Sequence, residues 1–417
     1  MGKRVLVVGS GGREHAIVDA LSRSEQVEKI YCAPGNAGIA AMAQCVAIKD
    51  TDVESLKAFA LEEGIDLTVV GPEASLAAGV ADTFRAAGLK IFGHTKSATR
   101  IESSKEFAKQ LMVKYNVPTA AYEAFDNYED AKAYVARTGV PTVLKYDGLA
   151  AGKGVVVAMT EQEADQALRD MLLDESFGKG RVVIEQFLEG PEFSLMCFVC
   201  GDKLYPMPVA QDHKRAYDGD TGPNTGGMGA YTCLPFITDE DLEYAMENIM
   251  RPTAAAMVAE GCPLTGVLYG GLMKTPNGIK VIEFNARFGD PETEVVLPLI
   301  TSDIYDIFEA VAEGRDAQNP TWDSCATLGI VLASKGYPGS YDKGYAITGR
   351  ENVDGVVYHM GTAAKDGQIV TAGGRVMIVV CKGDTLATAH AKANEQVAKI
   401  KCDNLFYRTD IGHKAFK

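Results

Sequence analysis

Short apolar runs alternate with amphipathic helical patterns over residues 1–103, and this alternation limits the possible folds more than any other feature of the sequence. Strands and helices of these lengths, in strict alternation, are typical of a parallel sheet covered by helices. The sequence therefore predicts an α/β protein whose N-terminal domain holds a doubly wound parallel sheet. The expected strands are residues 5–8, 27–32, 45–48, 66–70 and 90–92.

The first expected strand ends in a glycine-rich turn, Gly9-Ser-Gly-Gly12, that leads into a helix. The dinucleotide fingerprint needs a third small residue where this chain has Glu14, and an acidic residue ending the second strand, which is absent. NAD is therefore not the expected ligand. Backbone N–H groups around Gly11 could still bind a phosphate or carboxylate of a substrate, because a helix N-terminus attracts anions. A tight turn without a ligand is the alternative.

A loop of small residues joins two expected strands, residues 141–146 and 155–158. No helix follows the loop and no Ser or Thr follows its lysine, so it differs from a Walker loop. Small residues let backbone N–H groups approach phosphates, and lysines add positive charge. We therefore expect a flap that covers the phosphates of a nucleotide, with a flexible hairpin as the alternative. The residues concerned are Lys145, Gly152, Lys153 and Gly154.

The segment Glu283-Phe-Asn-Ala-Arg287 extends an apolar run at residues 280–282 that reads as a strand. Side chains two positions apart on a strand share a face, so Glu283, Asn285 and Arg287 are expected to point the same way. Oxygen ligands beside a fixed cation suit a magnesium ion that holds nucleotide phosphates. A solvated strand face, on which charged residues also alternate, is the alternative.

Two further segments have the composition of binding elements. Residues 182–193 run from an apolar strand into a turn, where the backbone could bind adenine and Glu192 could accept ribose hydroxyls. Residues 212–229 are polar and rich in glycine, and so long a loop is usually functional. His213 within that loop is expected to hydrogen-bond rather than to act as a base. Arg375 follows a glycine turn and could reach a phosphate or lie on the surface.

Length and charge limit the class of protein. A chain of 417 residues suggests about three domains, which we expect at 1–103, 104–324 and 325–417, with a flap subdomain at about 120–190. The last is expected to be a small α+β domain. A net charge of −15 without a basic tract argues against a nucleic-acid partner. No apolar run approaches the ~20 residues of a membrane span, and a cytoplasmic monomer is expected.

The order of these motifs resembles the ATP-grasp ligases over nearly the whole chain. The likeness begins with Lys105, in a helix expected from residue 97 to about 116, and continues through Lys145 and the flap to the pair Glu283 and Asn285. The sequence is thus expected to fold as a central ATP-grasp region between the N-terminal and C-terminal domains.

Within that superfamily the chain resembles the phosphoribosylamine–glycine ligase family. The resemblance rests on residues 5–16, 71–73, 147–154 and 222–229, and on the run Arg287-Phe-Gly-Asp-Pro-Glu, which is highly specific. Two positions depart from the expected pattern. Position 294 is Glu where Gln is expected, and Leu272 lies where many ATP-grasp enzymes carry an acidic metal ligand.

The resemblance implies an ATP-dependent carbon–nitrogen ligase of de novo purine biosynthesis. The carboxylate of glycine would attack the γ-phosphate of ATP to give glycyl phosphate and ADP. The amine of 5-phosphoribosylamine would then displace phosphate and form glycinamide ribonucleotide. Such transfer depends on positioning and charge neutralisation rather than on a covalent nucleophile. The implied cofactor is Mg²⁺ or Mn²⁺, with ATP as co-substrate.

The resemblance also implies roles for single residues. Glu283 and Asn285 would hold the metal, Arg287 would stabilise charge on the acyl phosphate, and Asp212 would receive the ammonium of glycine. ATP would be bound by Lys105, Lys145, Gly152, Lys153, Gly154, Glu185, Leu188 and Glu192. The other substrates would be bound by Gly11, Asn36, Glu73, Gly226, Gly227, Met228, Pro291 and Arg375. Two alternatives are an ATP-grasp enzyme that carboxylates or formylates a nucleotide, and an ATP-binding regulatory protein without activity.

Overall fold

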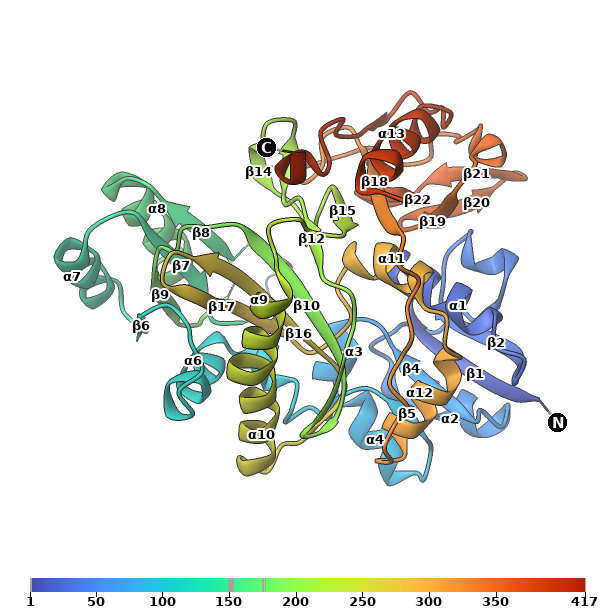
Figure 1. Ribbon diagram of the computed structural model, residues 1–417, viewed down its shortest axis with the longest axis horizontal. Helices are drawn as coiled ribbons and strands as arrows, with labels where there is room; N and C mark the ends of the chain where they lie inside the picture. The colour runs from blue at the N-terminus through green and yellow to red at the C-terminus, as the bar shows by residue number, and fades with distance from the viewer. Residues whose placement is uncertain (1, 149–153, 175, 177, 417) are drawn as a thin grey trace.

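The computed structural model describes residues 2–148, 154–174, 176 and 178–416. Figure 1 shows an N-terminal α/β unit on the right, a small sheet with two helices on the left, and the C-terminal region at the top. Long strands of a central sheet run between them. Among the described residues, no helix is both long and apolar enough to cross a membrane.

The N-terminal unit is a five-stranded sheet in the order β3-β2-β1-β4-β5, with every pair parallel. This confirms the doubly wound parallel sheet predicted from the alternation of strands and helices. Its strands are β1 (Lys3–Gly9), β2 (Val27–Pro34), β3 (Gln44–Cys45), β4 (Leu67–Val70) and β5 (Ile91–Phe92). Its helices are α1 (Gly12–Ser22), α2 (Val53–Glu62), α3 (Glu73–Ala77) and α4 (Val80–Ala86).

Glu14 explains why the glycine-rich turn departs from the dinucleotide fingerprint. Its carboxylate folds back on the turn, where Oε2 accepts the N–H of Gly11 at 2.5 Å and Oε1 accepts Nε of Arg13 at 2.6 Å. A Cβ at Gly71 would lie 1.9 Å from Glu14 Oε1, and one at Gly9 would lie 2.6 Å from its Cδ. The glycines therefore make room for a buried carboxylate at the start of α1.

The flap subdomain is a four-stranded antiparallel sheet in the order β6-β9-β7-β8. Helices α7 (Tyr128–Thr138) and α8 (Glu161–Leu172) pack on it through a shared apolar core. The two strands expected beside the flap loop are present as an antiparallel pair. The strands are β6 (Tyr122–Phe125), β7 (Thr142–Tyr146), β8 (Val155–Ala158) and β9 (Val182–Gln186).

A ten-stranded sheet forms the centre of the molecule and continues into the C-terminal region. Its main path is β17-β16-β10-β12-β15-β18-β22-β19, and the pairing of β15 with β18 carries it across residue 325. The strands are β10 (Glu192–Gly201), β11 (Lys203–Pro206), β12 (Ala210–Asp212), β15 (Gly229–Thr232), β16 (Leu264–Thr275), β17 (Gly278–Asn285), β18 (Ala326–Ser334), β19 (Val356–His359), β22 (Arg375–Gly383) and β23 (Leu405–Phe406).

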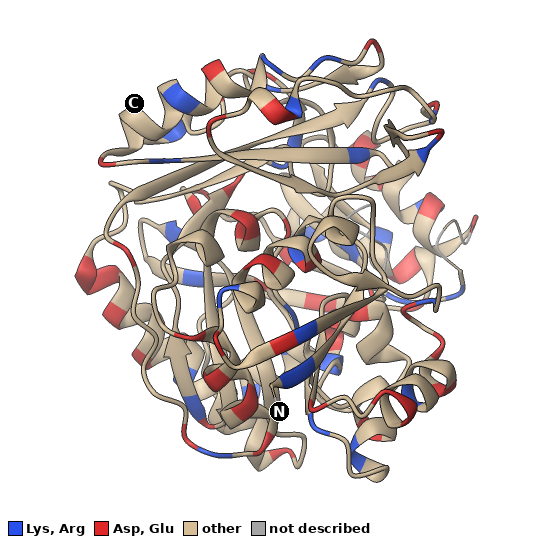
Figure 2. Ribbon diagram, turned by 90° about the vertical axis from the view of Figure 1, so that its right-hand side faces the viewer, with Lys and Arg blue, Asp and Glu red and all other residues tan. Residues whose placement is uncertain are grey.

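Helices and two hairpins complete the fold. The hairpins are β13 (Arg215–Tyr217) with β14 (Thr221–Asn224), and β20 (Thr362–Lys365) with β21 (Gln368–Thr371). Charged residues of both signs are interspersed along the ribbon on the side that Figure 2 shows. The helices are α9 (Asp239–Ala245), α10 (Arg251–Ala259), α11 (Glu292–Val296), α12 (Ile304–Ala312) and α13 (Leu386–Val397).

The single helix expected from residue 97 to about 116 is broken in two. Helix α5 (Arg100–Ser103) ends at Ser104, whose extended backbone starts the second helix, α6 (Lys105–Lys114). The hydroxyl of Ser104 accepts the N–H of Phe107 at 3.2 Å, as an N-cap residue does. The break places Lys105 at the first turn of α6, so the sequence prediction of one helix was wrong.

Four buried phenylalanines join the N-terminal sheet to the central sheet. Phe92 of β5 and Phe308 of α12 have ring centroids 4.4 Å apart, and Phe198 of β10 lies 6.0 Å from Phe308. Phe288 completes the cluster at 6.2 Å from Phe92. Close aromatic packing of this kind fixes the two units against each other.

We expect Phe308→Ala to lower the free energy of unfolding by about 3–5 kcal/mol, because it leaves a cavity among the other three rings. Leu61→Ala is the matched control, since the Leu61 side chain is 55% exposed and its truncation should cost under about 0.5 kcal/mol. Urea denaturation measures both. A loss from Phe308→Ala as small as that of the control would contradict the proposed role of the cluster.

Candidate active site

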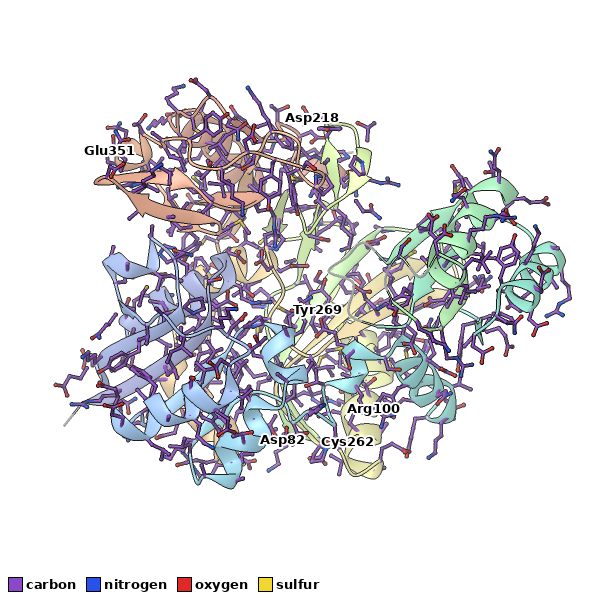
Figure 3. All side chains as sticks on the ribbon, turned by 180° about the vertical axis from the view of Figure 1, so that it is seen from behind. Asp82, Arg100, Asp218, Cys262, Tyr269 and Glu351 are labelled. Carbon is purple, nitrogen blue, oxygen red and sulfur yellow. The ribbon has the colours of Figure 1, made fainter. Side chains whose placement is uncertain are left out.

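Two adjoining cavities of about 340 and 380 Å³ lie where the flap subdomain faces β16 and β17. The first reaches toward the N-terminal unit and the second toward β9 and β10. Tyr269, which lines the first cavity, is labelled near the centre of the molecule in Figure 3. Residues lining both cavities are Lys145, Val155, Glu185, Asp212, Lys214, Thr225, Ile282 and Glu283.

The cavities collect most of the residues singled out in the sequence. Those found in the lining are Glu73, Lys105, Lys145, Gly154, Glu185, Leu188, Glu192, Asp212, Gly226, Glu283, Asn285, Arg287 and Arg375. Gly11, Asn36, Gly227, Met228 and Pro291 are not among the lining residues. Gly152 and Lys153 lie outside the described residues.

Glu185 and two lysines form a buried ion triad in the wall of the cavities. Lys145 Nζ lies 2.9 Å from Glu185 Oε1, and Lys109 Nζ lies 2.8 Å from Oε2. All three side chains are at most 4% exposed. Burial lowers the pKa of Lys109 to about 8, although Glu185 acts to raise it. Removing Glu185 would leave two buried lysines without their counter-ion, so this carboxylate fixes the geometry of the wall.

Lys145 also ties the flap subdomain to β17. Its Nζ donates to the carbonyl of Ile282 at 2.8 Å. Ile282 is the extra residue of a β-bulge, since Val281 faces Leu272 and Glu283 faces Gly271 on β16. A bulge re-aims side chains, and this one turns both Ile282 and Glu283 toward the cavity.

Glu283 is a carboxylate in the wall that both cavities share. It forms no ion pair or side-chain hydrogen bond with the rest of the chain that the structure describes. Burial acts to raise the pKa of Glu283, but Lys145, Lys214 and Lys105 outweigh burial and lower it. The carboxylate is therefore ionised at neutral pH, with its oxygens free to accept a ligand.

Asn285 and Arg287 line the first cavity together with Glu283, and β17 ends at Asn285. Arg287 Nη2 donates to Asn285 Oδ1 at 3.2 Å. Its Nε lies 3.3 Å from Glu102 and 3.6 Å from Glu73. Burial acts to lower the pKa of Arg287, but Glu102 and Glu73 raise it, so the guanidinium stays charged.

Asp212 and Lys214 form an ion pair between the two cavities. Lys214 Nζ lies 2.9 and 2.8 Å from the two carboxylate oxygens of Asp212. Burial acts to lower the pKa of Lys214, but Asp212 holds it well above its usual value. The pair places one anion and one cation within reach of a small zwitterion.

A buried carboxyl group faces this pair. Glu292 Oε1 accepts the hydroxyls of Tyr269 at 2.8 Å and Ser194 at 2.9 Å. Burial and the charge of Asp212 both raise the pKa of Glu292. Two acidic groups with different environments, such as Asp212 and Glu292, are characteristic of functional sites.

Arg375 holds together three segments at the edge of the first cavity. Its Nη1 donates to the carbonyls of Gly226 at 2.7 Å and Asp290 at 3.1 Å, and lies 2.8 Å from Asp290 Oδ1. Gly227 packs so closely that a Cβ there would lie 2.4 Å from Pro291 Cδ. Met228 is fully buried in the core. Arg375, Gly226 and Asp290 line the cavity edge, whereas Gly227, Met228 and Pro291 are not among the lining residues.

The substrate-binding candidates of the N-terminal unit differ in whether their polar groups are free to bind a ligand. The Asn36 amide donates to the carbonyls of Ser10 and His359 at 2.8 Å each. Its Oδ1 accepts the N–H groups of Gly38 and Ile39. The Asn36 side chain is therefore occupied within the protein, as is the N–H of Gly11. Glu73, at the start of α3, opens on the cavity beside Arg287.

Lys105 lies near the stem of the flap. Its Nζ donates to the carbonyl of Gly148 at 3.0 Å, and its N–H donates to Asp147 Oδ1 at 2.5 Å. Asp147 thus caps helix α6, and the cap fixes Lys105 against the end of β7. Burial lowers the pKa of Lys105, with Glu283 acting in the opposite direction.

Several cavity residues were missed in the sequence analysis. Lys214 is adjacent to His213, in a loop already expected to be functional, and a lysine two positions after Asp212 was the available signal. Tyr269 and Ser194 carried no local signal, because they meet Glu292 only through the folding of β10 and β16. Missed residues that line the cavities include Arg13, Glu102, Lys109, Lys214, Tyr269 and Glu292, and Ser194 is a hydrogen-bond partner of Glu292 that lines neither cavity.

Comparison with known proteins identifies the family. Residues 3–102, 103–293 and 327–414 match the N domain, the ATP-grasp (A) domain and the C domain of phosphoribosylglycinamide synthetase. The chain is 54% identical over 415 residues to the phosphoribosylamine–glycine ligase of Halalkalibacterium halodurans, covering 99% of this chain and 97% of that protein. It is 50% identical over 417 residues to the Listeria innocua ligase, covering 99% of each.

Solved structures agree with this assignment. The crystal structure of phosphoribosylamine–glycine ligase from Thermotoga maritima superposes with a TM-score of 0.87 at 32% identity, covering 98% of this chain and 100% of that one. The biotin carboxylase domain of Hydrogenobacter thermophilus 2-oxoglutarate carboxylase, solved with MgADP, has the same fold at 17% identity, with a TM-score of 0.74 over 98% and 92% of the two chains. The chain therefore belongs to the phosphoribosylamine–glycine ligase family and is an ATP-dependent, ATP-grasp ligase of purine biosynthesis.

Proposed function

We propose that this protein joins glycine to 5-phosphoribosylamine through glycyl phosphate, giving glycinamide ribonucleotide, ADP and phosphate. The observation that carries the proposal is the continuity of the two cavities, which share Lys145, Asp212 and Glu283. A nucleotide in one cavity would present its γ-phosphate to a small amino acid in the other. Family membership supports the same reaction.

The second cavity suits ATP, with the adenosine part against its apolar wall and the phosphates toward the residues that it shares with the first cavity. Its wall combines apolar side chains, among them Leu188 and Met273, with the polar Glu185 and Glu192 at its edges. Apolar cavities with a few polar groups are typical of nucleotide sites. Lys105 and Lys145 would bind the phosphates. From the sequence pattern alone, Gly152, Lys153 and Gly154 are proposed to keep water away from the acyl phosphate.

Glu283 and Asn285 fit a divalent cation. The ionised, unpaired carboxylate of Glu283 and the amide oxygen of Asn285 are the hard ligands that Mg²⁺ takes, while phosphates and water fill its remaining positions. When bound, Mg²⁺ or Mn²⁺ would neutralise charge on the transferred phosphoryl group. No described group of three or more His, Cys, Asp or Glu side chains could hold a metal by protein ligands alone, which is consistent with this shared coordination.

Glycine is proposed to bind between Arg287 and the Asp212–Lys214 pair. Asp212 would accept hydrogen bonds from the ammonium group, and Arg287 would hold the carboxylate and then the acyl phosphate. Glu102 and Glu73 orient Arg287, so the guanidinium needs little rearrangement as charge develops. These residues position the substrates and neutralise their charge, and none of them is proposed as a covalent nucleophile.

5-Phosphoribosylamine is proposed to enter from the side of the N-terminal unit. Its amine would attack the carbonyl carbon of glycyl phosphate, forming the C–N bond as the C–O bond to phosphate breaks. Arg375 and the backbone of the Gly226–Gly227 loop would line its path, as would Glu73. Gly11, Asn36, Met228 and Pro291 would act through backbone groups or by supporting this loop, since their side chains are absent or enclosed.

The direct test is formation of the amide product from glycine, ATP and freshly prepared 5-phosphoribosylamine. ADP release should require glycine and should not be supported by formate or bicarbonate. Release with formate or bicarbonate instead would assign the chain to a different ATP-grasp reaction.

We expect Glu283→Ala to leave the melting temperature unchanged and to reduce turnover by about 10²-fold or more, because an oxygen ligand for the metal is lost. Asn277→Ala, in the exposed turn before β17, is the control and should keep normal turnover. Steady-state assays at a fixed, ordinary Mg²⁺ concentration check this. Near-normal activity of Glu283→Ala would refute the metal role.

Asp212→Asn should raise KM for glycine about tenfold or more, with a smaller effect on KM for ATP, because a charged acceptor for the ammonium is removed. Asp384→Asn, an exposed aspartate on the C-terminal region, serves as the control. The measurement is initial rate against each substrate at saturating levels of the others. An unchanged KM for glycine would exclude Asp212 from the glycine site.

A further inference from the structure

The end of the chain lies against the β13–β14 hairpin, which projects from the central sheet next to the nucleotide cavity. Figure 1 shows the C-terminus beside β14, and Figure 3 shows Asp218 of this hairpin next to the C-terminal region. Residues 408–414 make the contacts. The hairpin carries Lys214 just before it and Thr225 just after it, and both line the cavities.

Arg408 anchors the tail to the hairpin. Its guanidinium is 1% exposed and donates from Nη1 to Asp220 Oδ1 at 3.0 Å and to the carbonyl of Arg215 at 2.9 Å. Asp410 accepts from its Nε at 2.8 Å and from Nη2 at 2.9 Å. A buried guanidinium with this many partners holds a single geometry.

Other contacts extend the anchor along the tail. The N–H of Gly219 donates to Asp410 Oδ2 at 2.8 Å, and the N–H of Thr409 donates to Asp218 Oδ1 at 2.9 Å. His213 Nε2 accepts the N–H of Gly412 at 3.2 Å. Burial lowers the pKa of His213 to about 3, so the ring is neutral and serves as an acceptor, as expected of a hydrogen-bonding residue.

Lys414, which follows the anchored segment, lines the proposed nucleotide cavity. Lys414 Nζ lies 3.1 Å from Asp220 Oδ2, and both residues line the second cavity together with Arg215 and Asn224. The Lys414 side chain is 38% exposed, and its partner Asp220 is 29% exposed, so neither group is sealed in the protein interior. Asp220 is itself bound by the buried Arg408. The ion pair with Asp220 therefore restrains the position of Lys414, although Lys414 lies near the end of the chain.

We propose that Lys414 is a nucleotide-binding residue that the C-terminal region contributes, and that its ammonium group contacts the phosphates of the bound nucleotide. An ammonium group at the edge of a nucleotide cavity favours the phosphates, which carry the charge, over the neutral adenosine. The inference rests on the proposed assignment of the second cavity to ATP. It adds a contact from a part of the chain far from the ATP-grasp motifs in sequence.

The test is titration calorimetry of the full-length protein with MgADP and, separately, with adenosine, at low ionic strength. Lys414→Ala should weaken MgADP binding about five-fold, as expected for a partly exposed charge contact, and leave adenosine binding unchanged. Lys414→Arg should restore most of the affinity. Added salt should reduce the difference in MgADP affinity between the wild type and Lys414→Ala, because salt screens a partly exposed charge contact.

Lys392→Ala is the matched control. Lys392 is 37% exposed and pairs with Asp354 at 2.9 Å in the same C-terminal region, but it does not line either cavity. It should bind MgADP as the wild type does. Melting temperatures of both variants should match the wild type, because each removes one partly exposed ion pair.

Two outcomes would overturn the inference. One is MgADP affinity of Lys414→Ala equal to that of the Lys392→Ala control. The other is an equal loss of adenosine and MgADP affinity, which would mean that Lys414 shapes the cavity rather than contacts phosphate. If instead the wild type failed to bind MgADP at all, the assignment of the nucleotide cavity itself would fall, so the two failures are distinguishable.

Discussion

The pairing of buried charges is the constraint on which the rest of this structure depends. A cavity that handles phosphates needs cations, yet an isolated lysine is too costly to bury. Here the ammonium group of Lys145 lies between the carboxylate of Glu185 and the carbonyl of Ile282. Glu185 neutralises its charge, and the bond to Ile282 joins the flap subdomain to β17. The bulge that offers this carbonyl also turns Glu283 into the cavity, where the same lysine helps to keep it ionised.

The same principle operates at the other edges of the site. Arg287 is oriented by carboxylates from α3 and α5, and Arg375 joins the Gly226–Gly227 loop to Asp290. Each guanidinium therefore joins segments that are far apart in the chain. The proposed reaction needs three substrates in one site. These ion pairs join residues of the N-terminal unit, the central region and the C-terminal region at that site.

Sequence reasoning succeeded where the relevant physics is local. Alternating strand and helix patterns predicted the parallel N-terminal sheet. Glu283, Asn285 and Arg287, which the sequence singled out, line one cavity. It failed where a distant residue intervenes. The expected long helix breaks at Ser104, which caps the second half locally, and Asp147 from the end of β7 reinforces the new helix start by accepting the N–H of Lys105. Glu292 gains its raised pKa from burial and from Asp212, neither of which is visible in its neighbours along the chain.

By itself the sequence determined the fold class, the family and the residue types available for binding phosphate, because backbone periodicity, small-residue loops and specific motifs are properties of neighbouring positions. Only the tertiary structure decided which of those residues remain free for a ligand. Asn36 has its amide satisfied by four protein groups, whereas the carboxylate of Glu283 has no partner among the described side chains and opens on the cavity. The physical reason is that a polar group's availability depends on what folding brings within hydrogen-bond distance, and for a buried group those partners come from other elements.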